Sequence, residues 1–102
     1  MSLGNLAKMA QQMQAEMARV QHELESMTLE GSAGGGAVRA VVTGKQELVS
    51  VAIDPAVVDP ADVETLQELV TVAVNDALHA ARVAGEQRMA AVTGGLRIPG
   101  LG

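Results

Sequence analysis

The chain contains two long stretches in which apolar residues recur at alternating steps of four and three positions. This spacing, an average of about 3.5 residues, is typical of helices that pack along a seam with another helix. The first row comprises Leu6, Ala10, Met13, Met17, Val20, Leu24 and Met27, and the second comprises Val63, Leu66, Val70, Ala73, Ala77, Ala80 and Ala84. The pattern predicts two long helices and indicates assembly rather than catalysis.

The first helix is expected to begin between Ser2 and Asn5, which are both suitable caps, and to end near Met27 or Thr28. Its polar face carries charges at spacings that favour i,i+3 and i,i+4 ion pairs, namely Glu16, Arg19 and Glu23. Four methionines lie on or beside the apolar row, namely Met9, Met13, Met17 and Met27. They favour a packed core, with an adaptable binding groove as the alternative.

The second helix has a strong start signal, with Asp59 as its cap and Pro60 in the first helical position. The next breaker of similar strength is Thr93-Gly94-Gly95, so the helix could span about 33 residues and about 50 Å. A compact chain of this length has a diameter of roughly 33 Å. We therefore expect this helix to project beyond its own domain.

The residues between the two helices predict a small antiparallel sheet. Two β-rich runs, 37–43 and 47–53, are separated at hairpin spacing, and residues 28–30 are a candidate third strand. In the second run Val49, Val51 and Ile53 are expected to share one face and Leu48, Ser50 and Ala52 the other. The glycine-rich residues 31–36 predict a flexible connection. The expected fold is α+β, as a single domain over residues 1–102 with a loosely ordered tail from about residue 95.

Composition narrows the class of protein. None of the 102 residues is Phe, Tyr or Trp, so a core of Val, Leu, Ala and Met gains less burial and is expected to borrow some from a partner subunit. The lack of cysteine suits a reducing cytoplasm. No apolar run approaches the roughly 20 residues of a membrane helix, and the start does not resemble a signal peptide. We expect a cytoplasmic protein without a membrane partner.

Candidate catalytic and ligand sites are weak. His22 and His79 lack the neighbours of a metal site, no serine has a nucleophile-elbow context, and Gly44-Lys45 is followed by Gln46 rather than the Ser or Thr of a phosphate-binding loop. We therefore expect no enzymatic activity, metal, cofactor or small-molecule substrate. Asn75 is either solvated or bonded to a neighbouring backbone where the long helix meets the sheet.

Charge argues against bulk attraction to nucleic acid, because twelve acidic and seven basic residues give a net charge of -5. Any contact with DNA must come from local placement. Basic residues away from the sheet, which are Lys8, Arg19, Arg82, Arg88 and Arg97, are either scattered surface charges or the lining of an inner surface between splayed helices. The amides of Gln11, Gln12 and Gln14 would assist such a surface.

Several short motifs together resemble the YbaB/EbfC family of bacterial nucleoid-associated proteins over nearly the whole chain. They are Gly4-Asn5-Leu6, Lys8, Gln11-Gln12-Met13-Gln14, the glycine loop after Leu29-Glu30-Gly31, Val51-Ala52-Ile53-Asp54-Pro55, Leu69-Val70, Asn75-Asp76-Ala77, Gly94-Gly95 and Ile98-Pro99-Gly100. The resemblance implies an α-β-β-β-α subunit that forms a homodimer through its sheets, with long helices projecting like the arms of tweezers. It also implies a DNA-binding protein of the cytoplasm and nucleoid.

On this basis we expect binding to double-stranded DNA with low sequence specificity, affecting nucleoid organisation or gene expression. The candidate contacts are Lys8, Gln11, Gln12, Gln14, Arg19, Arg82 and Arg88. Where the family has several lysines in the first helix, this chain has Glu16, Arg19, His22, Glu23 and Glu25, which predicts weaker binding and a shallower salt dependence. The alternative is a protein-interaction module whose projecting helices clasp a partner protein.

Overall fold

The computed structural model describes residues 3–94, in which two long helices flank a three-stranded antiparallel sheet. The main elements are α1 (Leu3–Ser26), β1 (Thr28–Ala33), β2 (Val38–Thr43), β3 (Leu48–Ile53) and α2 (Val63–Gly94). Short 3-10 turns follow β1 (Gly34–Gly36) and β3 (Pro55–Val57). The order α-β-β-β-α and the α+β class confirm the prediction. The predicted tail from about residue 95, including Arg97, lies outside the described residues.

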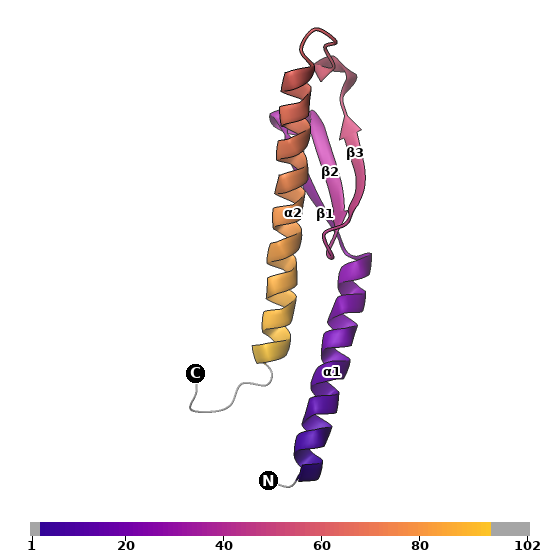
Figure 1. Ribbon diagram of the computed structural model, residues 1–102, viewed down its shortest axis with the longest axis vertical. Helices are drawn as coiled ribbons and strands as arrows, with labels where there is room; N and C mark the ends of the chain where they lie inside the picture. The colour runs from indigo at the N-terminus through magenta and orange to yellow at the C-terminus, as the bar shows by residue number, and fades with distance from the viewer. Residues whose placement is uncertain (1–2, 95–102) are drawn as a thin grey trace.

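The strands follow one another in the sheet as β1-β2-β3, and α2 packs against one face of it (Figure 1). Alternate residues of β2, which are Val38, Ala40 and Val42, are fully buried beneath α2. The intervening Arg39 is on the opposite face, where its Nε lies 3.9 Å from Oε1 of Glu30. The period-two pattern of the strand therefore separates the apolar core from a solvated face.

Small residues let α2 approach the sheet closely. Ala73, Ala77 and Ala81 recur every four residues and are fully buried against the strands. At Gly31 of β1 any side chain would overlap the backbone of Ala77. The predicted apolar row is confirmed from Leu66 to Ala77, whereas its first member, Val63, is 51% exposed. After Ala77 the buried residue is Ala81 rather than the predicted Ala80, because the face of α2 that meets the sheet is rotated slightly from the predicted row.

The glycine-rich segment is ordered, so the predicted flexible connection is wrong. Residues 31–33 complete β1, which extends beyond the candidate strand 28–30, and Gly34–Gly36 form a 3-10 turn. All three turn glycines have positive φ, from 62° to 93°, a conformation that residues with a side chain rarely adopt. The glycines therefore build a tight connection rather than a loose one.

The start of α2 also differs from the prediction. The Asp59 carboxylate accepts a hydrogen bond from the backbone N–H of Ala61, and this local turn uses Asp59 before the helix begins. Asp62 is the N-terminal cap instead, because its carboxylate accepts hydrogen bonds from the backbone N–H and hydroxyl of Thr65. The helix begins at Val63, three residues later than Pro60, and its end at Gly94 agrees with the predicted breaker.

In β3 the expected alternation of faces holds only in part. Val51 and Ile53 pair with inward-facing residues of β2, as expected for one shared face. The register then shifts, so that Val42 pairs with Leu48 and Val49 has no partner. This β-bulge leaves Leu48 and Val49 52% and 58% exposed at the edge of the sheet.

A side chain on α2 links the helix to the edge of the sheet. The carboxylate of Asp76 accepts a hydrogen bond of 3.1 Å from the backbone N–H of Ser32 in β1. Asn75, for which a bond at this junction was one alternative, is exposed. Its neighbour Asp76 makes the connection instead.

Most of the apolar row of α1 is exposed in this single chain. Only Val20 and Leu24 of this helix are buried. Leu24 packs over Gly44, where an added Cβ would lie 2.7 Å from the carbonyl oxygen of Leu24. Met13 and Met17 are both 37% exposed, and Met9 is more exposed still. The interpretation as a core is therefore wrong within the subunit for Met9, Met13 and Met17, because the projecting part of α1 has no sheet to pack on. Met27, which lies between α1 and β1, is half-buried.

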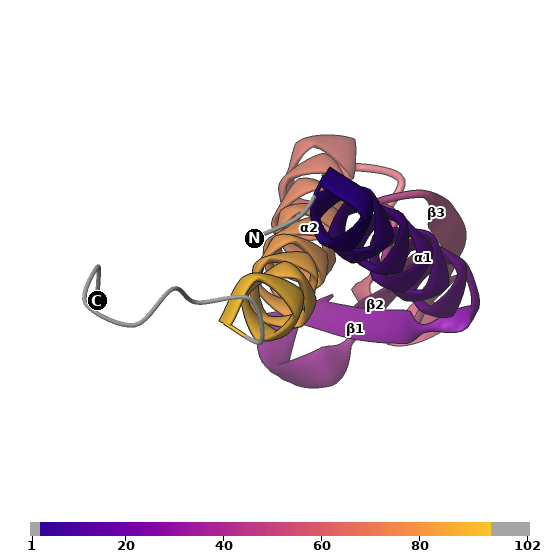
Figure 2. The ribbon, with the colours of Figure 1, turned by 90° about the horizontal axis from the view of Figure 1, so that it is seen from below.

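The molecule is elongated, with extents of 70 × 25 × 16 Å. Its radius of gyration is 19.9 Å, well above the roughly 13 Å of a compact chain of this length. Both helices extend past the same end of the sheet, which confirms the predicted overhang, and α1 reaches farther than α2 (Figure 1). Figure 2, seen from below, shows the end of α2 next to α1.

Candidate nucleic-acid interface

One face of α1 carries a row of polar residues beside the apolar row. Steps of four, four, three and four positions place its members on one side of the helix. This polar row comprises Lys8, Gln12, Glu16, Arg19 and Glu23. Three of the predicted DNA contacts, Lys8, Gln12 and Arg19, are therefore aligned and exposed on the projecting helix.

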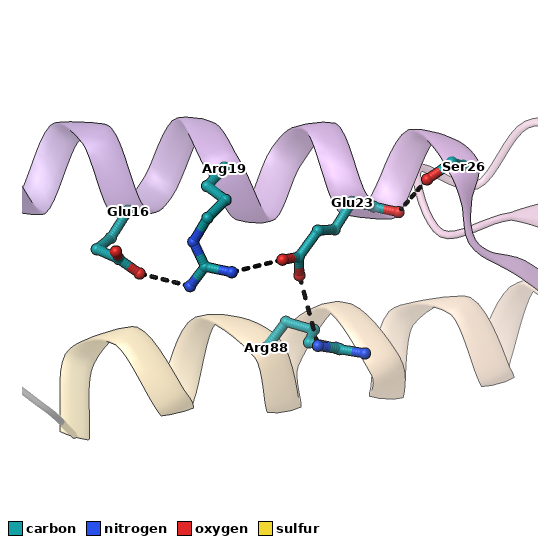
Figure 3. A network of polar contacts seen from close by, with 5 residues as sticks. All are labelled: Glu16, Arg19, Glu23, Ser26 and Arg88. Atoms are coloured by element: carbon teal, nitrogen blue, oxygen red, sulfur yellow. Dashed lines mark hydrogen bonds and ion pairs between the residues drawn. The ribbon is translucent and has the colours of Figure 1, made fainter.

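Arg19 is held by two carboxylates of the same row (Figure 3). Its guanidinium donates hydrogen bonds to Glu16 and to Glu23, which confirms the ion pairs expected from their spacing. The hydrogen bond to Glu16, followed by attraction to both carboxylates, raises the pKa of Arg19 above its ordinary value. Arg19 is thus always charged, but its charge is already shared by two acids.

Glu23 also reaches across to α2. While Oε1 of Glu23 accepts from Arg19, its Oε2 lies 3.4 Å from Nη1 of Arg88 (Figure 3). Arg88 follows Ala81 by seven residues, so it lies on nearly the same side of α2 as the residues that pack against the sheet. Beyond the end of the sheet this side meets α1. A single carboxylate therefore connects two of the predicted DNA contacts from different helices.

Arg82 lies at a separate groove. This groove, of about 470 Å³, is lined by Gln21 and Leu24 of α1, by Lys45 of the turn between β2 and β3, and by Arg82 of α2. Lys45 also places its Nζ 3.8 Å from Oε1 of Glu25. The fold thus brings Arg82 and Lys45 close to the end of α1 that joins the sheet, whereas Lys8 lies on its projecting half.

Two predicted contacts fall outside the polar row. Gln14 comes two positions after Gln12, about 200° around the helix axis, so it points to the opposite side of α1. Gln11 lies between the polar row and Gln14 around the helix axis. Both are exposed. Among residues 3–94, neither Lys8 nor Arg82 has an ion-pair partner, so their charges are available to a ligand.

Sequence reasoning missed two features of this region. The contact between Glu23 and Arg88 joins residues 65 positions apart, and no local pattern indicates such a pairing. Lys45 enters the sequence analysis only as part of a motif that does not fit a phosphate-binding loop. The only signal in the sequence was a basic residue at a turn. That this turn lies against α1 becomes visible only in the folded chain.

The negative charge is concentrated at one end of the molecule. Residues 54–68 contain five acidic and no basic residues, whereas the rest of the chain contains seven of each. This acidic end, comprising the connection after β3 and the first turns of α2, lies opposite the projecting half of α1 (Figure 1). Outside residues 54–68 the chain therefore has no net charge, although α1 itself has three acidic and two basic residues.

The histidines do not form a metal site in the described part of the chain. Nδ1 of His22 lies 3.8 Å from Oε2 of Glu25 on an exposed helix face, and His79 is exposed. Over residues 3–94 no three His, Cys, Asp or Glu side chains come together as metal ligands. Neither described helix has a stretch long and apolar enough to span a bilayer.

Comparison with known sequences identifies the family. The sequence profile of the YbaB/EbfC DNA-binding family matches residues 1–96. The chain belongs to the YbaB/EbfC DNA-binding family. This match confirms the resemblance inferred from the motifs of the YbaB/EbfC chain. The family is one of nucleoid-associated DNA-binding proteins rather than enzymes.

Relatives of this YbaB/EbfC chain align over almost their full length. A nucleoid-associated protein of Moorella thermoacetica is 52% identical and covers 98% of this chain and 99% of its own. A nucleoid-associated protein of Chloroflexus aurantiacus is 50% identical and covers 95% of this chain and 97% of its own. The crystal structure of the uncharacterized protein HP0035 from Helicobacter pylori superposes with a TM-score of 0.75 at 25% identity, covering 95% of this chain and 99% of that one.

Proposed function

We propose that this YbaB/EbfC protein binds double-stranded DNA with low sequence specificity as a homodimer in the cytoplasm, and thereby affects nucleoid organisation or gene expression. The observation that carries the proposal is the exposed polar row along α1, which lies away from the acidic end (Figure 1) of a chain whose family is DNA-binding. Its contacts to DNA are Lys8, Gln11, Gln12, Gln14, Arg19, Arg82 and Arg88.

Low specificity follows from the chemistry of these contacts. Lys, Arg and Gln side chains on an exposed helix donate hydrogen bonds to phosphate oxygens, which position a protein on DNA without reading its sequence. Lys8 and Arg82 are free to do so, whereas Arg19 and Arg88 must first exchange their carboxylate partners for phosphate. We therefore expect modest affinity with a clear dependence on salt concentration.

The homodimer is supported by the apolar edge strand of the sheet. Leu48 and Val49 are more than half exposed on β3, and Ile53 is 38% exposed. At the other edge, the N–H of Ser32 in β1 is already bonded to Asp76. Because exposed apolar edge strands readily pair with another chain, we propose that β3 forms the interface between two subunits.

The test of DNA binding is a salt series with a fluorescent random-sequence duplex. We expect saturable binding near physiological salt. A Lys8→Ala, Arg19→Ala double variant should lower the magnitude of the slope of log affinity against log salt, by about 0.9 for each lost phosphate contact. The decrease is therefore nearly 2 for each α1 helix that contacts DNA. Arg39→Ala, which removes a positive charge from the sheet, is the control. Unchanged affinity and slope in the double variant would refute the assigned contacts.

A second candidate function is favoured by the exposed apolar row of α1. Leu6, Met13 and Met17 remain accessible on the projecting helix, and methionine surfaces adapt to varied partners. This row could clasp an amphipathic helix of another protein. Such binding buries apolar area and depends weakly on salt, so the same salt series discriminates the two: no DNA binding even at low salt would favour the protein partner.

A further inference from the structure

The ion-pair network between the two helices uses cations that the proposed function needs. Glu23 contacts Arg19 of α1 through Oε1 and Arg88 of α2 through Oε2, while Glu16 holds the other side of Arg19 (Figure 3). Two arginines and two glutamates make a group with no net charge. A phosphate that approaches this part of the helices meets cations whose hydrogen bonds are already made.

We propose that Glu23 restrains DNA binding by holding Arg19 and Arg88 in a closed network, which a phosphate must open by displacing the Glu23 carboxylate. The inference rests on the proposed function and deepens it. DNA then competes with an internal anion, and the affinity of the protein is set partly by Glu23. This places an affinity-determining role on an acidic residue that itself repels DNA.

The position of Glu23 distinguishes it from the neighbouring acids. Its side chain is 34% exposed, compared with 52% for Glu16 and 58% for Glu25, so water screens its contacts less. Among the described residues it makes the only ion pair between α1 and α2. Glu16 contacts Arg19 alone, so removing Glu16 would leave Arg88 held.

The competition is weak enough for DNA to win. All four side chains are partly exposed, and ion pairs of this kind shift an equilibrium by less than about tenfold each. Phosphate contacts also gain from the release of counterions, which an internal carboxylate cannot supply. We therefore expect a restraint on affinity rather than a block.

The test is Glu23→Gln in the full-length protein, measured with a random-sequence duplex over a salt series. We expect affinity to rise about three- to tenfold at 0.15 M salt and the salt slope to steepen by about 1 to 2 for each engaged pair of helices, as Arg19 and Arg88 become available. The matched control is Glu86→Gln, which removes one negative charge from α2 two positions before Arg88. Glu86 makes no ion pair with Arg19 or Arg88. We expect it to change affinity no more than about twofold.

A second variant separates contact from charge. Glu23→Asp keeps the carboxylate but shortens its reach to Arg88, so affinity should rise even though the net charge is unchanged. Circular dichroism and thermal melting show whether each variant is folded before binding is measured. Glu16→Gln should give a smaller rise than Glu23→Gln, because Arg88 stays paired.

The outcomes separate this inference from the function on which it rests. If the wild type binds DNA and Glu23→Gln matches Glu86→Gln in affinity and slope, the restraint by Glu23 is refuted while DNA binding stands. If neither the wild type nor any variant binds even at low salt, the proposed function fails and the inference fails with it. A rise for Glu23→Gln and Glu23→Asp, with a smaller rise for Glu16→Gln and none for Glu86→Gln, supports both.

Discussion

At the scale of single residues, Gly31 decides how closely α2 approaches the sheet. A side chain at this position would overlap the backbone of Ala77, whereas a side chain at Gly85, in the middle of α2, meets no atom within 4 Å. The two glycines therefore have opposite roles. The first permits packing, and the second only weakens its helix.

We predict that Gly31→Ala lowers the free energy of unfolding by about 3 kcal/mol, because the added methyl group forces the helix and strand apart. Gly85→Ala should raise it by about 0.5–1 kcal/mol through better helix propensity. Urea unfolding followed by far-ultraviolet circular dichroism measures both, since the chain has no tryptophan. Similar changes in the two variants would contradict the close contact at Gly31.

Asp62 makes the stability of α2 depend on pH. Its hydrogen bond from the Thr65 hydroxyl, followed by that from the Thr65 backbone N–H, lowers the pKa of the Asp62 carboxyl in the folded chain. A lowered folded pKa means that the stabilisation is complete above the unfolded pKa of about 3.9 and is lost as the pH falls through the folded pKa.

We therefore predict that Asp62→Asn has a lower Tm than the wild type at pH 6, and that the difference shrinks as the pH falls below about 4. Thermal melts at pH 6, 4 and 2.5 test this. Asp59→Asn serves as the comparison, because Asp59 bonds only within the turn before the helix. A difference for Asp62→Asn that persists unchanged at pH 2.5 would rule out the charged cap.

At the scale of elements, the two edges of the sheet differ. β1 has a backbone N–H occupied by Asp76, whereas β3 exposes Leu48 and Val49 beside its bulge. We predict that Val49→Lys weakens the proposed dimer by about 3 kcal/mol or more, since each dimer loses two buried valines. Sedimentation equilibrium measures the dissociation constant.

The matched control is Ser32→Lys, which places the same charge on the other edge strand and should leave the dimer intact. If both variants dissociate equally, or if the wild type is a monomer at every concentration, β3 is not the interface. If Val49→Lys is a monomer, its DNA affinity shows whether the two helices of one subunit are enough to bind DNA.

At the scale of the whole molecule, the separation of charge explains how an acidic protein can bind DNA. The chain is 70 Å long, and its net negative charge lies in residues 54–68, at the end away from the projecting half of α1. Salt screens exposed charges beyond about 8 Å at physiological ionic strength. The acidic end is therefore several screening lengths from the polar row.

We predict that the double variant Glu64→Gln, Glu68→Gln changes DNA affinity less than twofold at 0.15 M salt, although it removes two negative charges. The single change Glu23→Gln should have the larger effect. Both are measured with the same duplex. A gain from the double variant that matches or exceeds that of Glu23→Gln would mean that net charge, rather than local placement, governs binding.

Much of this architecture could be predicted from local patterns. The apolar rows predict both helices, and the spacing of Glu16, Arg19 and Glu23 predicts their ion pairs, because neighbours three and four residues apart meet on any helix. The same logic does not reach Asp76, whose bond to Ser32 spans 44 positions. It also misjudged the glycine segment, since glycine marks both loose linkers and sites of close packing.

The sequence by itself determined the two helices, the β2–β3 hairpin, the family and the positions of the candidate cations, because these depend on short-range periodicity and on ordered motifs. Only the tertiary structure decided that Gly31 lies under α2, that the acidic residues gather at one end, and that Glu23 connects Arg19 to Arg88. These features arise from contacts between residues far apart in the chain. Their energies depend on distance in space, which no local pattern records.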